Sequence, residues 1–211
     1  MKANQDLWTL ERELTAEGFS RICGVDEAGA GPLAGPVYAA AVILPMGCSI
    51  SGLNDSKKLT EKQRDALYDE IIQAALAYAV ARVEAREIDE TDILSARMKA
   101  MQLAMDQLNP MPELALIDGN RDHGKRFAIT TPHRLVVGGD GKSASIAAAS
   151  ILAKVSRDRY VARELDALYP QYGFARHKGY GTKLHYAMLA QYGPCPAHRK
   201  TFLKKWKEGP L

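Results

Sequence analysis

The spacing of hydrophobic positions divides the first part of this chain into one helix and two strands. Three leucines recur at helical intervals before a glycine, so we predict a helix over residues 5–17. Residues 22–26 and 37–44 are short apolar runs of strand length, bounded by glycine and proline. Because the two runs are close in the chain, we expect them to pair as a hairpin.

The rest of the pattern alternates helices with strands. Thr60 is a candidate N-cap, and Gln63 is placed for a capping box at the start of a helix that runs to about residue 75. Further helices are predicted at 88–108, with a break near Asp89, and at 143–168, and further strands at 78–83, 114–117 and 134–137. This order predicts an α/β protein with one mixed sheet and helices on both faces.

The predicted elements suggest three parts in this chain of 211 residues, a length that suits one full-sized domain with small additions. Residues 1–20 form an N-terminal helical extension and residues 21–170 the α/β domain. Residues 171–211 form a small, basic helical subdomain.

The net charge of +3 conceals an uneven distribution of charge. Between Arg176 and Lys207 lie 8 of the 28 basic residues and none of the 25 acidic ones, so 20 basic and 25 acidic residues remain elsewhere. Five aromatic residues are interleaved with these basic side chains. Lysine and arginine neutralise phosphates, and aromatic rings stack on sugars or bases. A solvated helix face explains any single lysine, but the whole stretch favours a polyanionic partner.

Composition excludes several classes of protein. With 46% hydrophobic and 25% charged residues, the chain is typical of globular proteins rather than disordered ones. No apolar stretch is long enough to cross a bilayer, and the first 14 residues are too charged for a signal peptide. We therefore expect a cytoplasmic protein without a membrane partner. The three cysteines suggest reduced thiols, and Cys195 with His198 is at most half of a zinc site.

An acidic pair followed by glycines is the strongest chemical signal. Asp26 and Glu27 end an apolar run and precede a segment rich in glycine and proline. Buried carboxylates are costly unless they are paired or bound to metal, and glycines let backbone N–H groups approach a ligand closely. The pattern predicts a metal held against a phosphate or a sugar hydroxyl.

Two further acids, Asp118 and Asp140, follow other predicted strands. Ligands of open α/β sheets bind beyond the carboxyl ends of the strands, so we expect four carboxylates, including Asp26 and Glu27, to meet at one rim. Such a cluster requires a counter-charge, which Mg²⁺ or Mn²⁺ supplies. Two such ions about 3.5–4 Å apart support phosphodiester hydrolysis.

Each of these assignments has an alternative. Asp140 could instead cap the helix that follows it. Adjacent strand residues point to opposite faces, so Asp26 and Glu27 share a site only if the strand ends or kinks there, as Gly29 and Pro32 would allow.

Two loops are candidate substrate contacts. Lys57 and Lys58 lie in a polar loop that is either a solvated turn or, beside an acidic site, a phosphate contact. Lys178 and Tyr180 lie in a glycine-containing segment that offers a cation and a flat ring. Tyr180 has little local structure to pack into, because glycines flank it.

These motifs together resemble bacterial ribonuclease HII, and they occur in the family's order over residues 10–202. They are GVDEAG (24–29), GPLAG (31–35), NDSKKL (54–59), IDGN (117–120), AASILAKV (148–155), RD (157–158), YGF (172–174) and HKGY (177–180). The resemblance implies an RNase H-like fold and endonucleolytic cleavage of RNA in RNA–DNA hybrids. It also implies incision 5′ of single ribonucleotides in duplex DNA, which leaves a 3′-hydroxyl and a 5′-phosphate, by a protein expected to be a monomer.

The resemblance also implies roles for particular residues. It assigns the four carboxylates to catalysis and metal binding with Mn²⁺ or Mg²⁺, Tyr180 to the ribose at the junction, and Lys57, Lys58 and Lys178 to the substrate. The loop of Gly29, Ala30 and Gly31 would sense the 2′-hydroxyl through its backbone. Many members carry a basic residue at the position of Ala30, which retains only the backbone groups. Asp158 matches the acid of a structural Arg–Asp pair.

Two alternative functions remain open from the sequence. One is another RNase H-like nuclease, such as the type III paralogue, although only about twenty residues precede the first predicted strand. The other is a catalytically silent module that binds RNA–DNA hybrids through the basic tail.

Overall fold

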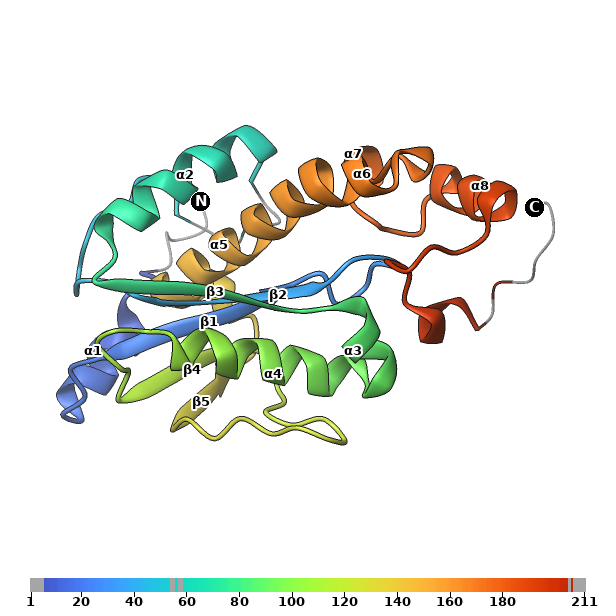
Figure 1. Cartoon of the computed structure of the whole chain (residues 1–211). Coiled ribbons are helices and arrows are strands. Elements are labelled where there is room, and N and C mark those ends of the chain that lie inside the picture. The colour runs from blue at the N-terminus through green and yellow to red at the C-terminus, as the bar shows by residue number, and fades with distance from the viewer. Residues whose placement is uncertain (1–5, 54–55, 57–58, 205, 207–211) are drawn as a thin grey trace.

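A five-stranded mixed sheet forms the centre of the computed structural model, which describes residues 6–53, 56, 59–204 and 206 (Figure 1). The strand order is β3–β2–β1–β4–β5, with β1, β2 and β3 antiparallel and β4 and β5 added in parallel to β1. The strands are β1 (Ile22–Ala28), β2 (Val37–Ile43), β3 (Ala77–Val83), β4 (Leu114–Asp118) and β5 (His133–Val136).

Helices cover both faces of the sheet, as the alternation of elements predicts. On one face α5 packs against β1 and β2 with α2 beside it, and on the other face α4 packs against β1, β2 and β3 (Figure 1). The helices are α1 (Thr9–Ala16), α2 (Glu61–Ala74), α3 (Ala85–Glu90), α4 (Ile93–Asp106), α5 (Ala144–Tyr160), α6 (Asp166–Leu168), α7 (Phe174–His177) and α8 (Lys183–Tyr192). The predicted α/β class with a helical C-terminal region is confirmed.

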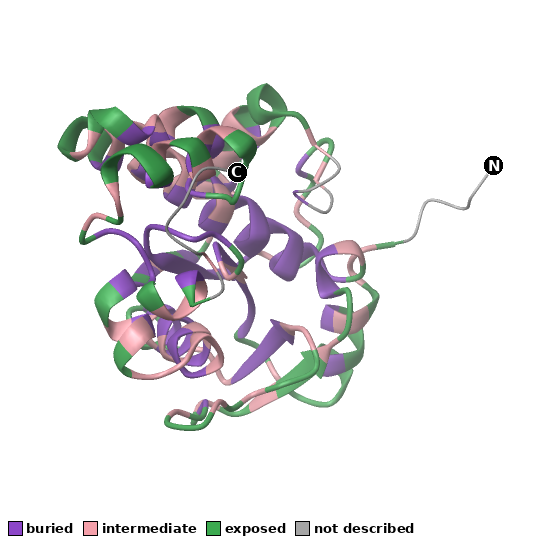
Figure 2. Ribbon diagram, turned by 90° about the vertical axis from the view of Figure 1, so that its right-hand side faces the viewer, coloured by how far each residue is buried: buried purple, intermediate pink, exposed green. Residues whose placement is uncertain are grey.

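Strand β1 is buried between the two helical layers, and its side chains alternate between them. Cys23 and Val25 pack in the core formed with α4, whereas Ala28 packs in the core formed with α5. At Gly24 an added Cβ would lie 2.0 Å from the carbonyl carbon of Ser145 in α5. Only glycine allows this close approach of helix and strand. Figure 2 shows the buried residues along α5 and the central strands.

Local signals located most element boundaries, with small corrections. The capping box of Thr60 and Gln63 is present, because each side chain accepts a hydrogen bond from the other's backbone N–H. The break in the 88–108 helix lies at Thr91 and Asp92 rather than near Asp89, since the Asp92 side chain accepts from the Ser95 N–H and begins α4. The predicted 143–168 helix is α5, a π-helical turn over Val161–Leu165, and α6.

The C-terminal region is built around a hydrophobic cluster of its own. Tyr172 and Phe174 stack with ring centroids 5.4 Å apart, and Leu189 of α8 packs in the same cluster. Leu33 and Ala34, from the loop after β1, complete the cluster and join this region to the α/β domain. The boundary between residues 170 and 171 stays a prediction. Within the described residues, no helix has the length and apolar character needed to span a membrane.

Candidate active site

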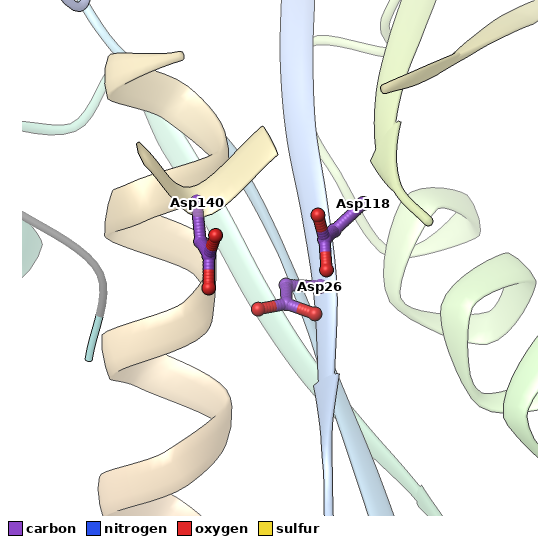
Figure 3. Close-up of side chains that lie close together, drawn as sticks. All are labelled: Asp26, Asp118 and Asp140. Atoms are coloured by element: carbon purple, nitrogen blue, oxygen red, sulfur yellow. The ribbon is translucent and has the colours of Figure 1, made fainter. Parts of the chain in front are cut away.

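Three of the four predicted carboxylates meet at the edge where β1 and β4 approach the start of α5 (Figure 3). Asp26 projects from β1, Asp118 is the last residue of β4, and Asp140 lies in the turn Gly139–Gly141. One oxygen from each carboxylate lies within 4.8 Å of the others. Asp26 and Asp140 are buried, with 5% and 6% of their surfaces exposed.

The chain holds this arrangement with short local contacts. The backbone N–H of Gly139 donates to Oδ1 of Asp118 over 2.6 Å, which ties the turn that carries Asp140 to the end of β4. Ser143, not Asp140, is the N-cap of α5, because its side chain accepts from the N–H of Ile146. The interpretation of Asp140 as a helix cap is therefore wrong.

Glu11 of α1 binds the N-terminal end of α5 through hydrogen bonds. Its Oε1 accepts hydrogen bonds from the hydroxyl of Ser143 at 2.6 Å and from the N–H of Ser145 at 3.1 Å. A carboxylate at a helix N-terminus is favoured by the helix dipole and by unpaired N–H groups. No local pattern in the sequence predicts this contact, because the residues that it joins are more than 130 positions apart.

Glu27 lies on the opposite face of β1 from Asp26. Strand pairing continues past it to Ala28, and the first departure from extended backbone is Gly29, at φ 91°. The strand therefore departs from extended geometry only after Glu27, so the condition for Asp26 and Glu27 to share a face is not met. Oε1 of Glu27 forms an ion pair with Arg97 of α4 over 2.6 Å, and Glu27 is outside the group of three converging carboxylates.

The three carboxylates fit a hard divalent cation. All of the donors are oxygen atoms, the ligand type that Mg²⁺ and Mn²⁺ prefer. Three negative charges within 4.8 Å repel one another strongly where burial weakens solvent screening, and a cation between them removes that repulsion. Among the residues that the structure describes, this is the one such cluster of three candidate ligands.

The glycine loop after β1 lies against two fully buried arginines. Gly29 adopts φ 91°, and an added Cβ there would lie 2.0 Å from Nε of Arg157. The guanidinium of Arg199 donates hydrogen bonds to the carbonyls of Gly29 and Ala30. The loop is thus a fixed part of the fold, and glycine is required at position 29 by both conformation and space.

The second predicted substrate segment is also held by the fold. Tyr180 is 40% exposed, and Nζ of Lys154 lies 5.6 Å from the centre of its ring. Lys178, the C-cap of α7, has φ 52°, and its ammonium group donates to the carbonyl of Ala175 in that helix. Lys57 and Lys58 lie outside the described residues.

The expected Arg–Asp pair has a different form. Asp158 pairs with Lys154 at 2.8 Å, while Nη1 of Arg157 lies 3.9 Å from Asp158 and donates instead to the backbone carbonyl of Lys178. The carbonyls that surround Arg157, rather than the neighbouring acid, accept its hydrogen bonds.

A chain of buried histidines supports Tyr180, and sequence reasoning did not find it. Nδ1 of His185 lies 2.9 Å from the carbonyl of Tyr180 and must donate to it, so Nε2 of His185 is an acceptor. Nε2 of His198, 2.9 Å away, therefore donates, which leaves Nδ1 of His198 to accept from the backbone N–H and thiol of Cys195. This order of donors requires both imidazoles to be neutral.

The buried histidines predict a pH-dependent stability. Burial lowers the pKa values of His185 and His198 to about 4, whereas in the unfolded chain they are near 6.5. Between these values the unfolded state binds more protons, so the free energy of unfolding falls as the pH drops from 6.5 to about 4. The slope is up to about 1.4 kcal/mol per pH unit for each ring. Urea unfolding at pH 7.5 and 5.5 measures this fall in the free energy of unfolding. If a His185→Gln variant lost as much stability between these pH values as the parent, His185 would not be a source of the pH dependence.

The comparisons with known proteins agree with this geometry. A family model described as Ribonuclease HII matches residues 23–208. Ribonuclease HII of Ruminiclostridium cellulolyticum is 50% identical over 99% of this chain and 80% of its own length. The structure of ribonuclease H2 from Pyrococcus horikoshii is similar with a TM-score of 0.69 and 28% identity, covering 86% of this chain and 93% of that one.

A third comparison concerns the fold alone. The structure of Bst-RNase HIII in complex with Mn²⁺ has a TM-score of 0.60 at 19% identity, over 90% of this chain and 67% of that one. Family model, sequence identity and fold all lead to one assignment. The chain belongs to the ribonuclease HII family and is a metal-dependent endoribonuclease that acts on RNA–DNA hybrids.

Proposed function

We propose that this chain also incises duplex DNA on the 5′ side of a single embedded ribonucleotide, leaving a 3′-hydroxyl and a 5′-phosphate. The observation that carries the proposal is the convergence of three carboxylates within 4.8 Å, one of them on the strand that leads into the glycine loop. Asp26, Asp118 and Asp140 would hold two divalent ions, Mg²⁺ or Mn²⁺. We also propose Glu27 as a fourth ligand, which would require the end of β1 to rearrange so that its carboxylate leaves Arg97 and reaches the face that carries Asp26.

The ions, when bound, would activate a water molecule and stabilise the charge that develops on the leaving oxygen. The residues around them would position the substrate. The backbone of Gly29, Ala30 and Gly31 would bind the ribose and the adjoining phosphate, because this loop leads directly from the strand that carries Asp26. Mn²⁺ in the similarly folded Bst-RNase HIII structure supports the choice of ions.

The exposed ring of Tyr180 would pack on the ribose at the junction between RNA and DNA. Its exposure of 40% leaves a face free for such a contact, and the buried histidines hold its backbone in place. Lys178, with Lys57 and Lys58, would contribute positive charge toward the phosphates. We propose that the protein acts as a monomeric cytoplasmic enzyme whose residues 171–211 bind substrate beside the catalytic domain over residues 21–170.

A duplex that contains one ribonucleotide tests the proposal directly. The labelled duplex is incubated with Mg²⁺, Mn²⁺ or EDTA, and the products are sized at single-nucleotide resolution. We expect one nick 5′ of the ribonucleotide with either ion and none in EDTA. A DNA polymerase should extend the new end, because that end carries a 3′-hydroxyl.

Two matched substrates serve as controls. The same duplex without the ribonucleotide, and one with a 2′-O-methyl group at that position, should remain uncut, because neither presents a free 2′-hydroxyl. Cleavage of a long RNA–DNA hybrid without cleavage of the single-ribonucleotide duplex would refute the proposed incision activity and leave only the hybrid nuclease.

A further inference from the structure

Two buried arginines bind the glycine loop through its carbonyl groups. The guanidinium of Arg199 is fully buried and donates three hydrogen bonds, to the carbonyls of Gly29 at 2.7 Å, Ala30 at 3.0 Å and Gly35 at 3.0 Å. Arginine presents its donors in a rigid planar fork, so three bonds to three peptide groups define the position of the loop closely.

Arg157 makes a second set of contacts of the same kind. It is also fully buried, and it donates to the carbonyls of Ala34 at 3.3 Å, Pro36 at 3.1 Å and Lys178 at 3.1 Å. Its last bond reaches the segment that carries Tyr180. The two arginines therefore join the two loops that are candidates for substrate binding.

Carbonyls that point inward force the neighbouring amides outward. In a trans peptide the C=O of one residue and the N–H of the next point in opposite directions. Because the carbonyls of Gly29 and Ala30 face Arg199, the N–H groups of Ala30 and Gly31 face away from it. Neither N–H has an acceptor within the part of the chain that the structure describes. At Gly31 an added Cβ would meet nothing within 4 Å, so this side of the loop is open.

We propose that Arg199 is a positioning residue that aims the amides of Ala30 and Gly31 at the ribose and phosphate of the substrate and thereby sets selectivity for a ribonucleotide. This inference rests on the proposed function, because it assumes that the loop reads the 2′-hydroxyl. Two adjacent outward N–H groups form an anion- and hydroxyl-binding nest. The side chain of Ala30 adds no polar group, so the orientation of the peptides carries the recognition.

The charge of the arginines acts in the same direction. Burial, with a contribution from Arg157, lowers the pKa of Arg199 to about 9, which still leaves the guanidinium protonated at neutral pH. The positive charge of Arg199, next to the carbonyls of Gly29 and Ala30, polarises these peptide groups. This polarisation strengthens hydrogen-bond donation by the N–H groups of Ala30 and Gly31.

The test compares binding of two duplexes, one with a single ribonucleotide and one entirely of DNA, at fixed salt. Binding is measured in an Asp118→Asn background so that no cleavage occurs. The variant Arg199→Met removes all three hydrogen bonds of the guanidinium and its charge. The variant Arg199→Lys keeps the charge but cannot form all three hydrogen bonds. We expect the ratio of the two dissociation constants to fall toward one in both variants, by about tenfold.

The ratio separates positioning from folding, because a loss of folded protein weakens both affinities equally. Gln102→Leu is the matched control. Gln102 is a buried polar residue of α4 whose carbonyl accepts from the N–H of Thr130, away from the loop. The Gln102→Leu substitution should leave the ratio of the two dissociation constants unchanged.

Each outcome has a distinct meaning. A parent protein that binds both duplexes equally would refute the proposed function itself. A parent that discriminates, together with an Arg199→Lys variant that folds and discriminates equally well, would overturn the role of Arg199 alone. If Arg199→Met does not fold, the ratio of dissociation constants measured for Arg199→Lys tests the role of Arg199.

Discussion

Asparagine in place of Asp118 is expected to reduce hydrolysis of the RNA strand in a hybrid by about 10³-fold, the scale expected when one electrostatic contributor to a transition state is removed. The carboxamide keeps an oxygen that accepts the 2.6 Å hydrogen bond from Gly139, so the turn that carries Asp140 stays in place. The substitution removes one negative charge from the three that converge. Hybrid binding should therefore persist while cleavage is lost, as measured with a labelled hybrid by gel shift and by product formation.

The same variant should be more stable than the parent when metal is removed. Three carboxylates within 4.8 Å repel one another, and the neutral amide relieves part of that repulsion. Thermal unfolding in EDTA should show a higher melting temperature for Asp118→Asn, and added Mn²⁺ should stabilise it less than it stabilises the parent.

Asp106→Asn is a suitable control for this experiment. Asp106 is an exposed residue at the end of α4, on the face of the sheet opposite α5, and its Oδ1 accepts a hydrogen bond from Gln102. Its cleavage rate and metal dependence should match those of the parent. Full activity of Asp118→Asn, or a lower melting temperature in EDTA, would remove the basis for a metal site at this cluster.

Alanine at Gly24 is expected to destabilise the protein by about 3 kcal/mol, the upper part of the range for overpacking a core. The new Cβ would lie 2.0 Å from the carbonyl carbon of Ser145 and 2.2 Å from the nitrogen of Ile146. Both atoms belong to the backbone at the start of α5, so no side-chain rotation relieves the clash. The helix would have to move away from β1 and carry Asp140 away from Asp26.

Urea unfolding at neutral pH measures this effect, and Gly31→Ala provides the comparison. Gly31 has no positive φ, and an added Cβ there would meet nothing within 4 Å. The free energy of unfolding of Gly31→Ala should therefore differ from that of the parent by less than about 0.5 kcal/mol. Equal stability of Gly24→Ala and the parent would mean that α5 and β1 are not packed as closely as described.

Much of the fold was predictable because its signals are local. The capping box of Thr60 and Gln63 spans three positions, and the apolar runs that became β1 and β2 differ plainly in spacing from the helices around them. The convergence of Asp26 with Asp118 followed from a general rule, since parallel neighbouring strands end at the same edge. Sequence motifs alone also indicated the ribonuclease HII family.

Other features depend on contacts between distant residues. The sequence by itself determined the strands, the helices and the acids that lie near the strand ends, because periodicity and turn chemistry act over a few residues. Only the tertiary structure decided that Glu27 faces Arg97 rather than Asp26, because the strand keeps its alternation until Gly29. It also decided that Arg199, in a basic segment suited to a solvated surface, is fully buried, because its acceptor Gly29 lies 170 positions away.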